Sequence, residues 1–597
     1  MQTKHFIEDP THLVNTALHS LTITNPSLAL DAENKIVYRR PEKNAEPKVS
    51  IITGGGSGHE PGFAGFGLVT AGVAGTIFAS PSAQQVRRAI ATRVPHEKGV
   101  FVITMNYTGD VLNFGMAAEK AKAEGVATEF FAIGDDVGVG RKKGGKVGRR
   151  GIAGGILILK MIGALAELGG SLSEVHQLAQ LANKNLVSLG SSLEHVHVPG
   201  RAIPDEDAVS MTIKTSSEIE VGMGIHNEPG SHKITAPLPE LIRIMLGHML
   251  DPNDKDRAFV PFDFENDQVV LFVNNLGGVS MLEIAGITAE ATLQLDRDWG
   301  LKPVRTISGT FLTSLNGMGF SLSVLRLADT GLGPGKTMLK LLDFPSEAVG
   351  WVAPISTSTW DAANDTTMEN TTSGTGTAKP SSLTLGPTLA VSALQSGLKR
   401  LIANEADVTK FDTIVGDGDC GVGLKRGAEA VLREITNPDS PMPSDAVAFI
   451  SRIVPVIEDT MDGTSGAIYA IFMNALAYGL RSQDPSSSSS SPTPVTPSIW
   501  AAALKSSLND LAKYTPAQPG DRTLMDALVP FIETLQETGD VKKAAKVAMD
   551  GAENTKHLQA SLGRTVYVGG ESEFMGKIPD PGAWGLGLFL QGLAEGL

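Results

Sequence analysis

Two short stretches, far apart in the chain, combine residue types that can do chemistry. The first is the turn GGGSGHEPG, in which His59 stands on a nearly bare backbone that exposes N–H groups to an oxygen-rich molecule. The second is GDGDCG, which holds Asp417 and Asp419, with Asp412 just before it. Carboxylates this close need a cation, and hard oxygen ligands favour Mg²⁺ or Ca²⁺ over zinc. A small-molecule cradle and a separate cation site indicate a two-substrate enzyme, with phosphoryl transfer as the leading reaction.

Two further loops carry residues that could act with the first turn. NYTGD places Asp110 just after the apolar run at 100–103, and GMGIHNEPG places His226 among small residues. Ligands of open α/β sheets lie beyond the carboxyl ends of the strands, so we expect His59 and Asp110 to converge on one pocket. Asp110 could equally cap a helix that starts at Val111. A turn histidine is often structural, yet a neutral imidazole in such a loop can act as base, ligand or nucleophile.

Short glycine-rich loops also accompany the acidic stretch. DGTSG, GDRT and DPG each stand at a boundary between expected helices. Hydroxyl and N–H groups near helix N-termini are natural phosphate contacts, so these loops and GDGDCG together predict a nucleotide site unlike a P-loop. The alternative for GDGDCG is a solvated acidic turn with a structural, calcium-like ion, although its spacing departs from an EF-hand. The sequence has no zinc-spaced His/Cys cluster and no Gly-x-Ser-x-Gly elbow, so zinc and serine hydrolases lack support.

The elements that must position these residues change character along the chain. Strands alternate with amphipathic helices in the first part, which is the pattern of α/β units. The expected strands include 49–52, 100–103 and 269–273, and the expected helices include 116–124 and 281–293.

This pattern predicts a division into domains. We expect two α/β domains, 1–200 and 201–356, then a flexible linker at 357–384 that is rich in Ser, Thr, Gly and Asn. Within 385–597, helical spacing recurs with few strand-like runs and predicts an all-α domain, with helices expected at 385–403, 422–434, 444–458, 466–480, 499–514, 524–537 and 583–595. A low-complexity Ser/Pro-rich insertion at 482–498 interrupts it, and we expect this insertion to be disordered.

Composition narrows the class of protein. The chain has 597 residues, 42% of them hydrophobic, which is ample for real cores. Its formal net charge of −15 argues against nucleic acid as a partner. A single cysteine, Cys420, excludes an intramolecular disulfide. The N-terminus has no apolar signal core, and the most apolar run, 154–168, is too short to span a bilayer and contains Lys160. We therefore expect a cytoplasmic enzyme without a membrane partner.

The motifs resemble one family closely. GGGSGHEPG, NYTGD, GRRGIAGG, GMGIHNEPG, GDGDCG, DGTSGA, GDRT and DPGA occur in the order found in single-chain, ATP-dependent dihydroxyacetone (glycerone) kinases, and the likeness covers nearly the whole chain. It implies a K-type part of two α/β domains that holds the triose, and an L-type part, an all-α barrel that holds ATP. Relatives that take phosphate from a phosphotransferase protein keep these parts as separate subunits, so their fusion here favours ATP.

The resemblance gives roles in triose chemistry to matching residues. His226 matches the histidine that adds covalently to the substrate carbonyl as a hemiaminal, which captures a ketone or aldehyde and not glycerol. Asp110 matches the acid that takes the proton of the terminal hydroxyl, and His59 matches a residue that assists proton transfer. The substrate contacts implied are Gly56, Ser57, Gly58, His59, Met105 and Asp110.

The same resemblance gives roles in nucleotide binding. Asp412, Asp417 and Asp419 match the carboxylates that hold Mg²⁺, with two ions expected, against the ATP phosphates. The nucleotide contacts implied are Asp417, Gly418, Asp419, Cys420, Thr464, Ser465, Thr523, Leu524, Asp580, Pro581 and Gly582.

One departure and two alternatives accompany the resemblance. Many family members have Lys just before NYTGD where this chain has Met105, and a lost ammonium would weaken contacts to substrate oxygens.

Dihydroxyacetone is the expected substrate, D-glyceraldehyde a second one, and a homodimer the expected assembly. A different enzyme class is FAD–AMP lyase, which forms cyclic FMN and would not need His226. A third is a non-catalytic triose-binding regulator, against which the intact carboxylate loop argues.

Overall fold

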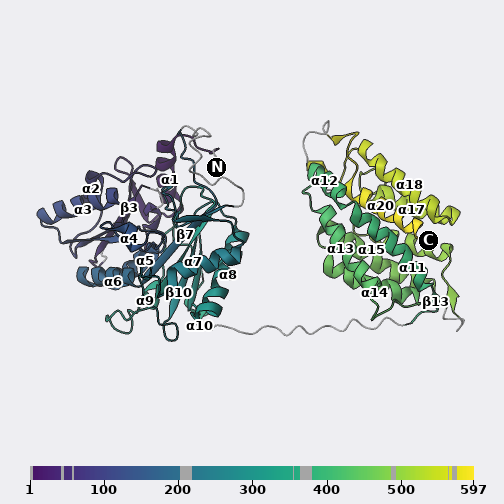
Figure 1. The fold of residues 1–597 in the computed structure, drawn as a ribbon. Coiled ribbons are helices and arrows are strands. Elements are labelled where there is room, and N and C mark those ends of the chain that lie inside the picture. Colours follow the sequence, from purple (N-terminus) through teal and green to yellow (C-terminus); the bar gives the residue numbers. More distant parts are fainter. Residues whose placement is uncertain are drawn as a thin grey trace. The chain divides into compact units, whose positions relative to one another are not determined.

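The computed structural model divides the chain into two compact units, 1–367 and 368–597, which are described separately (Figure 1). We call them the α/β unit and the helical unit. The structure describes residues 4–41, 46–56, 60–201, 218–353, 355–362, 380–485, 492–562, 564–567 and 574–597.

The first sheet of the α/β unit has the strand order β1-β2-β4-β3-β5-β6. Its strands are β1 (Leu28–Asp31), β2 (Ile36–Arg39), β3 (Ser50–Gly55), β4 (Ala71–Ala74), β5 (Val100–Met105) and β6 (Thr128–Ile133). Strands β4, β3, β5 and β6 are parallel, so the carboxyl ends of β3 and β5 lie at one edge. All residues of β3 and β5 are buried, as expected for a parallel sheet covered on both faces.

The second sheet has the order β11-β10-β12-β7-β8-β9 and is mostly antiparallel. Its strands are β7 (Leu186–Ser192), β8 (Ile219–Val221), β9 (His232–Ile234), β10 (Val269–Asn275), β11 (Arg305–Gly309) and β12 (Gly319–Arg326). Strand β7 belongs to this second sheet although it comes before residue 200, where the sequence predicts the boundary between the two α/β domains. That boundary stays a prediction.

Helices cover both sheets in layers. They are α1 (Pro10–Thr24), α2 (Ala83–Thr92), α3 (Thr108–Ala123), α4 (Arg141–Gly144), α5 (Gly155–Glu167), α6 (Leu172–Lys184), α7 (Leu238–Leu250), α8 (Met281–Trp299), α9 (Met338–Leu342), α10 (Thr357–Ala362) and the 3₁₀ turn η1 (Glu60–Phe63). Helices α2 and α3 pack on one face of the first sheet, and α7 and α8 on one face of the second. The remaining core, which includes α5, joins residues of both sheets.

The helical unit is a bundle of antiparallel and crossing helices (Figure 1). They are α11 (Pro387–Ala403), α12 (Glu405–Val415), α13 (Cys420–Ile435), α14 (Ala446–Thr460), α15 (Gly463–Ser482), α16 (Pro497–Leu511), α17 (Met525–Thr538), α18 (Val541–Asn554) and α20 (Pro581–Glu595), with the 3₁₀ turns η4 (Thr555–His557) and η5 (Arg564–Tyr567). The α20 helix packs against α11, α12, α17 and α18, which gives the bundle its centre.

The predicted fold class, α/β followed by all-α, is confirmed, and the strands expected at 49–52, 100–103 and 269–273 are present as β3, β5 and β10. Part of the expected linker is ordered, because α10 occupies its start and β13 (Leu383–Thr384) pairs in parallel with β14 (Thr493–Pro494). The segment 363–379 and the insertion core 486–491 lie outside the described residues.

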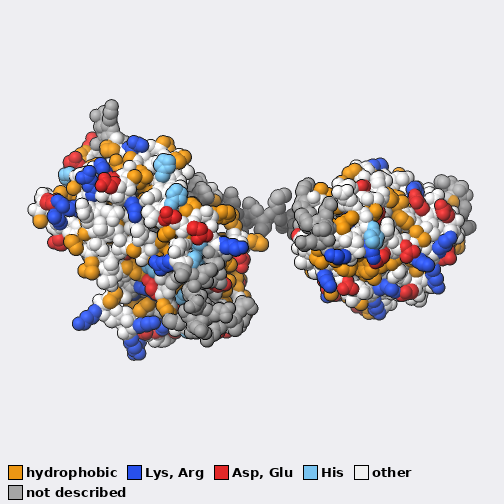
Figure 2. Space-filling view, turned by 90° about the horizontal axis from the view of Figure 1, so that it is seen from above, with side chains coloured by type: hydrophobic (Ala, Val, Ile, Leu, Met, Phe, Trp, Pro, Cys, Tyr) orange, Lys and Arg blue, Asp and Glu red, His pale blue; other side chains and the backbone are white. Residues whose placement is uncertain are grey.

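The described surface seen in Figure 2 has no large region of a single charge sign. Acidic and basic side chains are interspersed on the face of both units that Figure 2 shows. None of the helices in the described part of the chain has the length and apolar character that a membrane span requires.

Candidate active site

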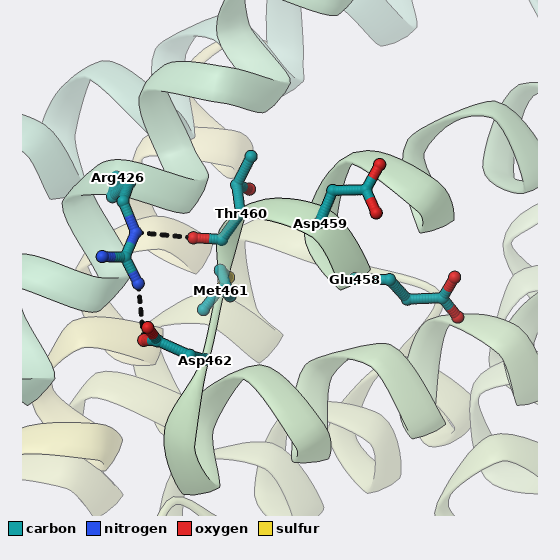
Figure 3. A pocket seen from close by; sticks show the side chains of 6 residues that line it. All are labelled: Arg426, Glu458, Asp459, Thr460, Met461 and Asp462. Carbon is teal, nitrogen blue, oxygen red and sulfur yellow. Dashed lines mark hydrogen bonds and ion pairs between the residues drawn. The ribbon is translucent and has the colours of Figure 1, made fainter. Parts of the chain in front are cut away.

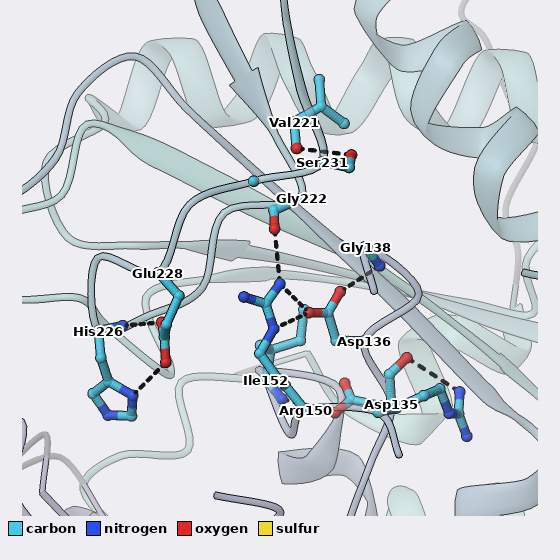
Figure 4. A network of polar contacts seen from close by, with 12 residues as sticks. Asp135, Asp136, Gly138, Arg150, Ile152, Val221, Gly222, His226, Glu228 and Ser231 are labelled. Atoms are coloured by element: carbon cyan, nitrogen blue, oxygen red, sulfur yellow. Dashed lines mark hydrogen bonds and ion pairs between the residues drawn. The ribbon is translucent and has the colours of Figure 1, made fainter. Parts of the chain in front are cut away.

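His226 lies in the loop that joins β8 to β9 (Figure 4). Its backbone N–H donates to Oε2 of Glu228 at 2.9 Å, and its ring Nδ1 lies 3.3 Å from Oε1 of the same carboxylate. The residue between them, Asn227, has a left-handed backbone with φ of 64°, which turns Glu228 back toward the imidazole. One carboxylate thus contacts both the main chain and the side chain of the predicted nucleophile.

Two aromatic rings meet the imidazole of His226 edge-on. The ring centroid of Tyr107 is 4.6 Å away at an interplanar angle of 79°, and that of Phe78 is 5.2 Å away at 78°. Phe78 has a left-handed backbone with φ of 58°, and its N–H donates to the carbonyl of Gly56 at 2.5 Å. Strained backbone of this kind is concentrated at functional sites.

The His226 loop is anchored by several polar contacts. The Asn227 amide donates to the carbonyl of Val196 at 2.8 Å, and its Oδ1 accepts from the Val196 N–H at 2.9 Å. The Ser314 hydroxyl donates to the carbonyl of Ile225 at 2.6 Å. Arg150 donates to the carbonyl of Gly222 at 2.7 Å and pairs with the buried Asp136 (Figure 4).

Asp110 stands in the first turn of α3, at the carboxyl end of β5. The N-cap position belongs to Tyr107, so Asp110 is not the cap that the sequence left open. Its side chain is buried, and Oδ1 has no hydrogen-bond partner among the described residues. Burial raises the pKa of Asp110 to about 6, against a hydrogen bond from Ser80 and the nearby His226, which lower it. A carboxylate with this pKa is suited to accept a proton near neutral pH.

The predicted cradle is described only in part. A Cβ built at Gly56 would lie 2.4 Å from the backbone N of Ala79, so no side chain fits there. Ser57, Gly58 and His59 lie outside the described residues. The side chain of Met105 is buried in the core, where a Cβ on Gly151 would come within 2.8 Å of it. Met105 therefore faces the core, which leaves its backbone as the part that a substrate can meet.

The three predicted metal ligands of the helical unit lie together. Ligand atoms of Asp412, Asp417 and Asp419 are all within 4.8 Å of one another. Asp412 lies outside the GDGDCG loop, in the last turn of α12, where it is buried and accepts the Cys420 N–H at 2.9 Å. Gly418 has φ of 82°, the left-handed conformation that lets the loop turn between the other two carboxylates.

This set of ligands fits a hard divalent cation. Carboxylate oxygens are the ligands that Mg²⁺ prefers, and Mg²⁺ usually keeps open positions for water and phosphate oxygens. Asp417 and Asp419 are exposed, so a bound ion would remain accessible to phosphates.

Helix N-termini carry most of the predicted nucleotide contacts. Cys420 begins α13, Thr464 and Ser465 stand in the first turn of α15, Leu524 precedes α17, and Asp580 caps α20 by accepting the Ala583 N–H at 2.7 Å. The cysteine Sγ lies 3.9 Å from the Ser465 hydroxyl. Burial raises the pKa of Cys420 to about 12, with nearby Asp412, Asp580 and Asp419 adding to the shift. The starts of α13 and α15 therefore lie next to each other, with the carboxylates of Asp412, Asp419 and Asp580 near Cys420.

Two residues of this region were missed by sequence reasoning. Asp526 accepts the N–H groups of Gly520 at 2.6 Å and Thr523 at 2.9 Å, and so shapes the GDRT loop. The buried Arg522, with φ of 60°, donates to the carbonyls of Thr555 and Ile578. Arg522 is a charged residue inside a glycine-containing loop, as Arg150 and Glu228 are in the α/β unit, and this was the available signal. Asp526 stands in the first turn of α17 and gave no such signal.

A cavity of about 400 Å³ opens beside the start of α15 (Figure 3). It is lined by Arg426, Glu458, Asp459, Thr460, Met461 and Asp462. The Arg426 guanidinium already has partners, because it donates to the Thr460 carbonyl at 2.6 Å and to the Asp462 carboxylate at 2.5 Å. Its lining is half acidic and contains none of the residues predicted to contact nucleotide.

Family models match both parts of the chain. A Dak1 domain model matches residues 19–350, and a DAK2 domain model matches residues 414–595.

Full-length relatives are similar throughout. Dihydroxyacetone kinase from Pichia angusta is 41% identical over 100% of this chain and 98% of its own length. Human triokinase/FMN cyclase is 34% identical over 100% of this chain and 99% of its own length. Among solved structures, the dihydroxyacetone kinase of C. freundii in complex with AMP-PNP and Mg²⁺ is 30% identical with a TM-score of 0.61, and covers 100% of both chains.

Proposed function

The chain belongs to the family of dihydroxyacetone kinases, and from that premise we propose that it phosphorylates dihydroxyacetone with ATP. One observation carries the proposal. The same chain holds a partly buried His226 with a buried Asp110 near it in the α/β unit, and a three-carboxylate cluster between the end of α12 and the start of α13 in the helical unit. The first can capture and deprotonate a small hydroxyketone, and the second can hold a nucleotide with its cation.

His226 is the group proposed to hold the triose. Its imidazole adds to the carbonyl carbon, so the substrate is bound as a hemiaminal and its terminal hydroxyl is held in place. Glycerol has no carbonyl and cannot form this bond, so the capture selects ketone and aldehyde trioses. D-glyceraldehyde is therefore proposed as a second substrate.

Asp110 is the proposed base for the terminal hydroxyl. It is buried near His226, and a pKa of about 6 leaves it ionised at neutral pH, ready to take the hydroxyl proton as the oxygen attacks phosphorus. Gly56 closes the triose site with backbone alone, and His59, which lies outside the described residues, is proposed to assist proton transfer.

Asp412, Asp417 and Asp419 are proposed to hold Mg²⁺. When bound, the metal neutralises the charge that spreads over the transferring phosphoryl group. The N–H and hydroxyl groups of Thr464 and Ser465 bind and orient the phosphates at the start of α15. The proposed nucleotide contacts also include Gly418, Cys420, Thr523, Leu524, Asp580, Pro581 and Gly582.

The direct test measures ADP release by the purified full-length chain with Mg-ATP and dihydroxyacetone, D-glyceraldehyde or glycerol. We expect turnover with both carbonyl trioses and none above background with glycerol. Equal turnover with glycerol, or no turnover with dihydroxyacetone, would contradict the proposal. Light scattering on the same sample tests the proposed homodimer, and cell fractionation tests the proposed cytoplasmic location.

A second activity, formation of cyclic FMN from FAD, is favoured by the full-length similarity to triokinase/FMN cyclase. It would use the metal and nucleotide groups of the helical unit and would not need His226. Incubation with FAD and Mn²⁺ therefore separates the two activities, because His226→Ala should lose the kinase reaction and keep the cyclase reaction.

A further inference from the structure

We propose that Glu228 is a positioning residue that fixes the tautomer of His226, so that ring Nε2 carries the lone pair that attacks the triose carbonyl. The inference rests on the proposed function, because it concerns the same capture step. Glu228 has no role in the site implied by the motifs, although it stands two residues after His226.

The geometry of the carboxylate defines the tautomer. A carboxylate only accepts hydrogen bonds, and Oε1 of Glu228 faces Nδ1 of His226 at 3.3 Å. Nδ1 is therefore the nitrogen that carries the hydrogen in the neutral ring, and Nε2 keeps the lone pair. The second oxygen accepts the His226 N–H at 2.9 Å, so the carboxylate is fixed relative to the main chain of the residue it orients (Figure 4).

Aromatic contacts complete the orientation of the ring. Phe78 and Tyr107 meet the imidazole edge-on, at 5.2 and 4.6 Å between centroids. With these rings against it and Glu228 at Nδ1, the imidazole is held against a ring flip that would exchange its two nitrogens. Only 18% of the His226 side chain is exposed, so water competes weakly for these contacts.

The charge of Glu228 suits the capture step. Burial opposes its ionisation, but the interactions with His226, hydrogen bonds first among them, outweigh burial and lower the pKa of Glu228 to about 2. Glu228 is therefore an anion throughout the neutral range. Arg150 also lies close enough to interact with Glu228. Because Arg150 forms an ion pair with Asp136, its single positive charge is shared between the two carboxylates.

The covalent step balances without a further reactant. The Nε2 lone pair forms the bond to the carbonyl carbon, and the π pair of the C=O bond moves to the oxygen. The oxygen takes up one proton and Nδ1 finally gives one up to solvent, so that ketone plus imidazole equals hemiaminal. Between these events the ring carries a positive charge, which the Glu228 carboxylate at Nδ1 stabilises. A buried aspartate performs the same task for the histidine of a serine protease triad.

The test compares Glu228→Gln with the unmodified full-length chain. Glutamine can present its NH₂ group to Nδ1, which favours the opposite tautomer. We expect kcat/KM for dihydroxyacetone to fall about ten- to a hundredfold, the effect of losing a hydrogen bond to a charged group, with the KM for ATP unchanged. Glu228→Asp keeps a carboxylate and should recover part of the loss. Glu240→Gln, an exposed carboxylate of α7, is the matched control and should behave as wild type.

A spectroscopic readout makes the test independent of turnover. In protein labelled with ¹⁵N histidine, His226 should show a protonated Nδ1 and an unprotonated Nε2, and Glu228→Gln should reverse or mix this pattern. The opposite tautomer in the wild type, or an unchanged kcat/KM in Glu228→Gln, would overturn the proposal. If the wild type shows the expected tautomer but no triose turnover, the proposed function fails and the positioning by Glu228 stands.

Discussion

The two units hold their reactive groups in opposite environments. In the α/β unit, Asp110 is buried and the His226 ring is held by Glu228 and two aromatic edges. In the helical unit, Asp417 and Asp419 are exposed on a loop between two helices. A small triose is uncharged and offers no ionic contacts, so an enclosed pocket and the proposed covalent bond would have to hold it. A nucleotide carries several charges, which helix termini and a cation can hold at an open surface.

The largest test of this contrast removes the proposed covalent contact between the triose and His226. His226→Ala should lower kcat/KM for dihydroxyacetone by about a thousandfold or more, because the remaining pocket has only weak contacts for a small triose. Near-normal turnover at low dihydroxyacetone would show that hydrogen bonds suffice there. Mass spectrometry of the intact protein with triose should find the adduct in the wild type and not in the variant.

The next test removes one carboxylate from the exposed cluster. Asp417→Asn should lower kcat/KM for Mg-ATP about a hundred- to a thousandfold, since it weakens the charge stabilisation of the phosphoryl group. Capture of the triose should persist, as judged by the same adduct mass. Asp407→Asn changes an exposed carboxylate in the first turn of α12 and is the matched control. Loss of the adduct in Asp417→Asn would mean that the two sites are not separable.

A smaller effect concerns the pH dependence of the buried base. As the proposed base, Asp110 has to be ionised, so kcat/KM should fall as the pH drops through about 6, its raised pKa. The Ser80 hydrogen bond lowers this pKa, so Ser80→Ala should move the acid limb to higher pH, by up to about one pH unit. A pH–rate profile of both proteins measures the shift, and a move toward lower pH would contradict this description of Asp110.

The smallest effect is on stability and concerns Lys160, which is fully buried in α5. Its Nζ donates to the Leu341 carbonyl at 3.2 Å and lies 5.6 and 5.8 Å from the ring centroids of Phe344 and Trp351. Burial lowers its pKa from 10.5 to about 7. Between these values the unfolded chain binds a proton that the folded chain does not, so this group adds stability as the pH rises.

Lys160→Met removes that dependence. Below pH 7 the variant should be more stable by roughly 1–3 kcal/mol, because the cost of the buried charge outweighs the lost hydrogen bond to Leu341. The advantage should shrink as the pH rises toward 10.5, the unfolded value. Melting curves of both proteins across this range measure the difference, and a gap that does not change with pH would contradict burial of the ammonium charge as its cause.

Much of the fold and several site residues could be predicted from sequence, but two helices could not. Only Asn404 separates the end of α11 at Ala403 from the start of α12 at Glu405, so no loop signal marks a second helix there. Asp412 therefore fell outside the helices expected from the sequence. The α18 helix (Val541–Asn554) buries only alanines, Ala544, Ala545, Ala548 and Ala552, so its core face lacks the large apolar side chains that mark a helix in a sequence.

The contacts around the candidate site were harder to predict for another reason. His226 and Asp110 stand in recognisable motifs, but Phe78 and Ser80 come from a segment with no motif and reach the site through tertiary folding. Met105 shows the converse. Its place beside NYTGD suggested a substrate contact, yet the side chain points to the other side of β5, toward Gly151 and Gly155. Direction along a strand depends on register, which a motif does not state.

The position of α5 determines how the α/β unit can come apart. The helix is buried along its whole length, and its core joins strands of both sheets. At Gly163 the helix packs directly against the backbone at Leu68, since a Cβ on Gly163 would lie 1.8 Å from the Leu68 carbonyl oxygen. A fragment that ends before the second sheet would leave one side of α5 bare and prone to aggregate. The two sheets should therefore melt together in one cooperative transition, and neither should survive as an autonomous module.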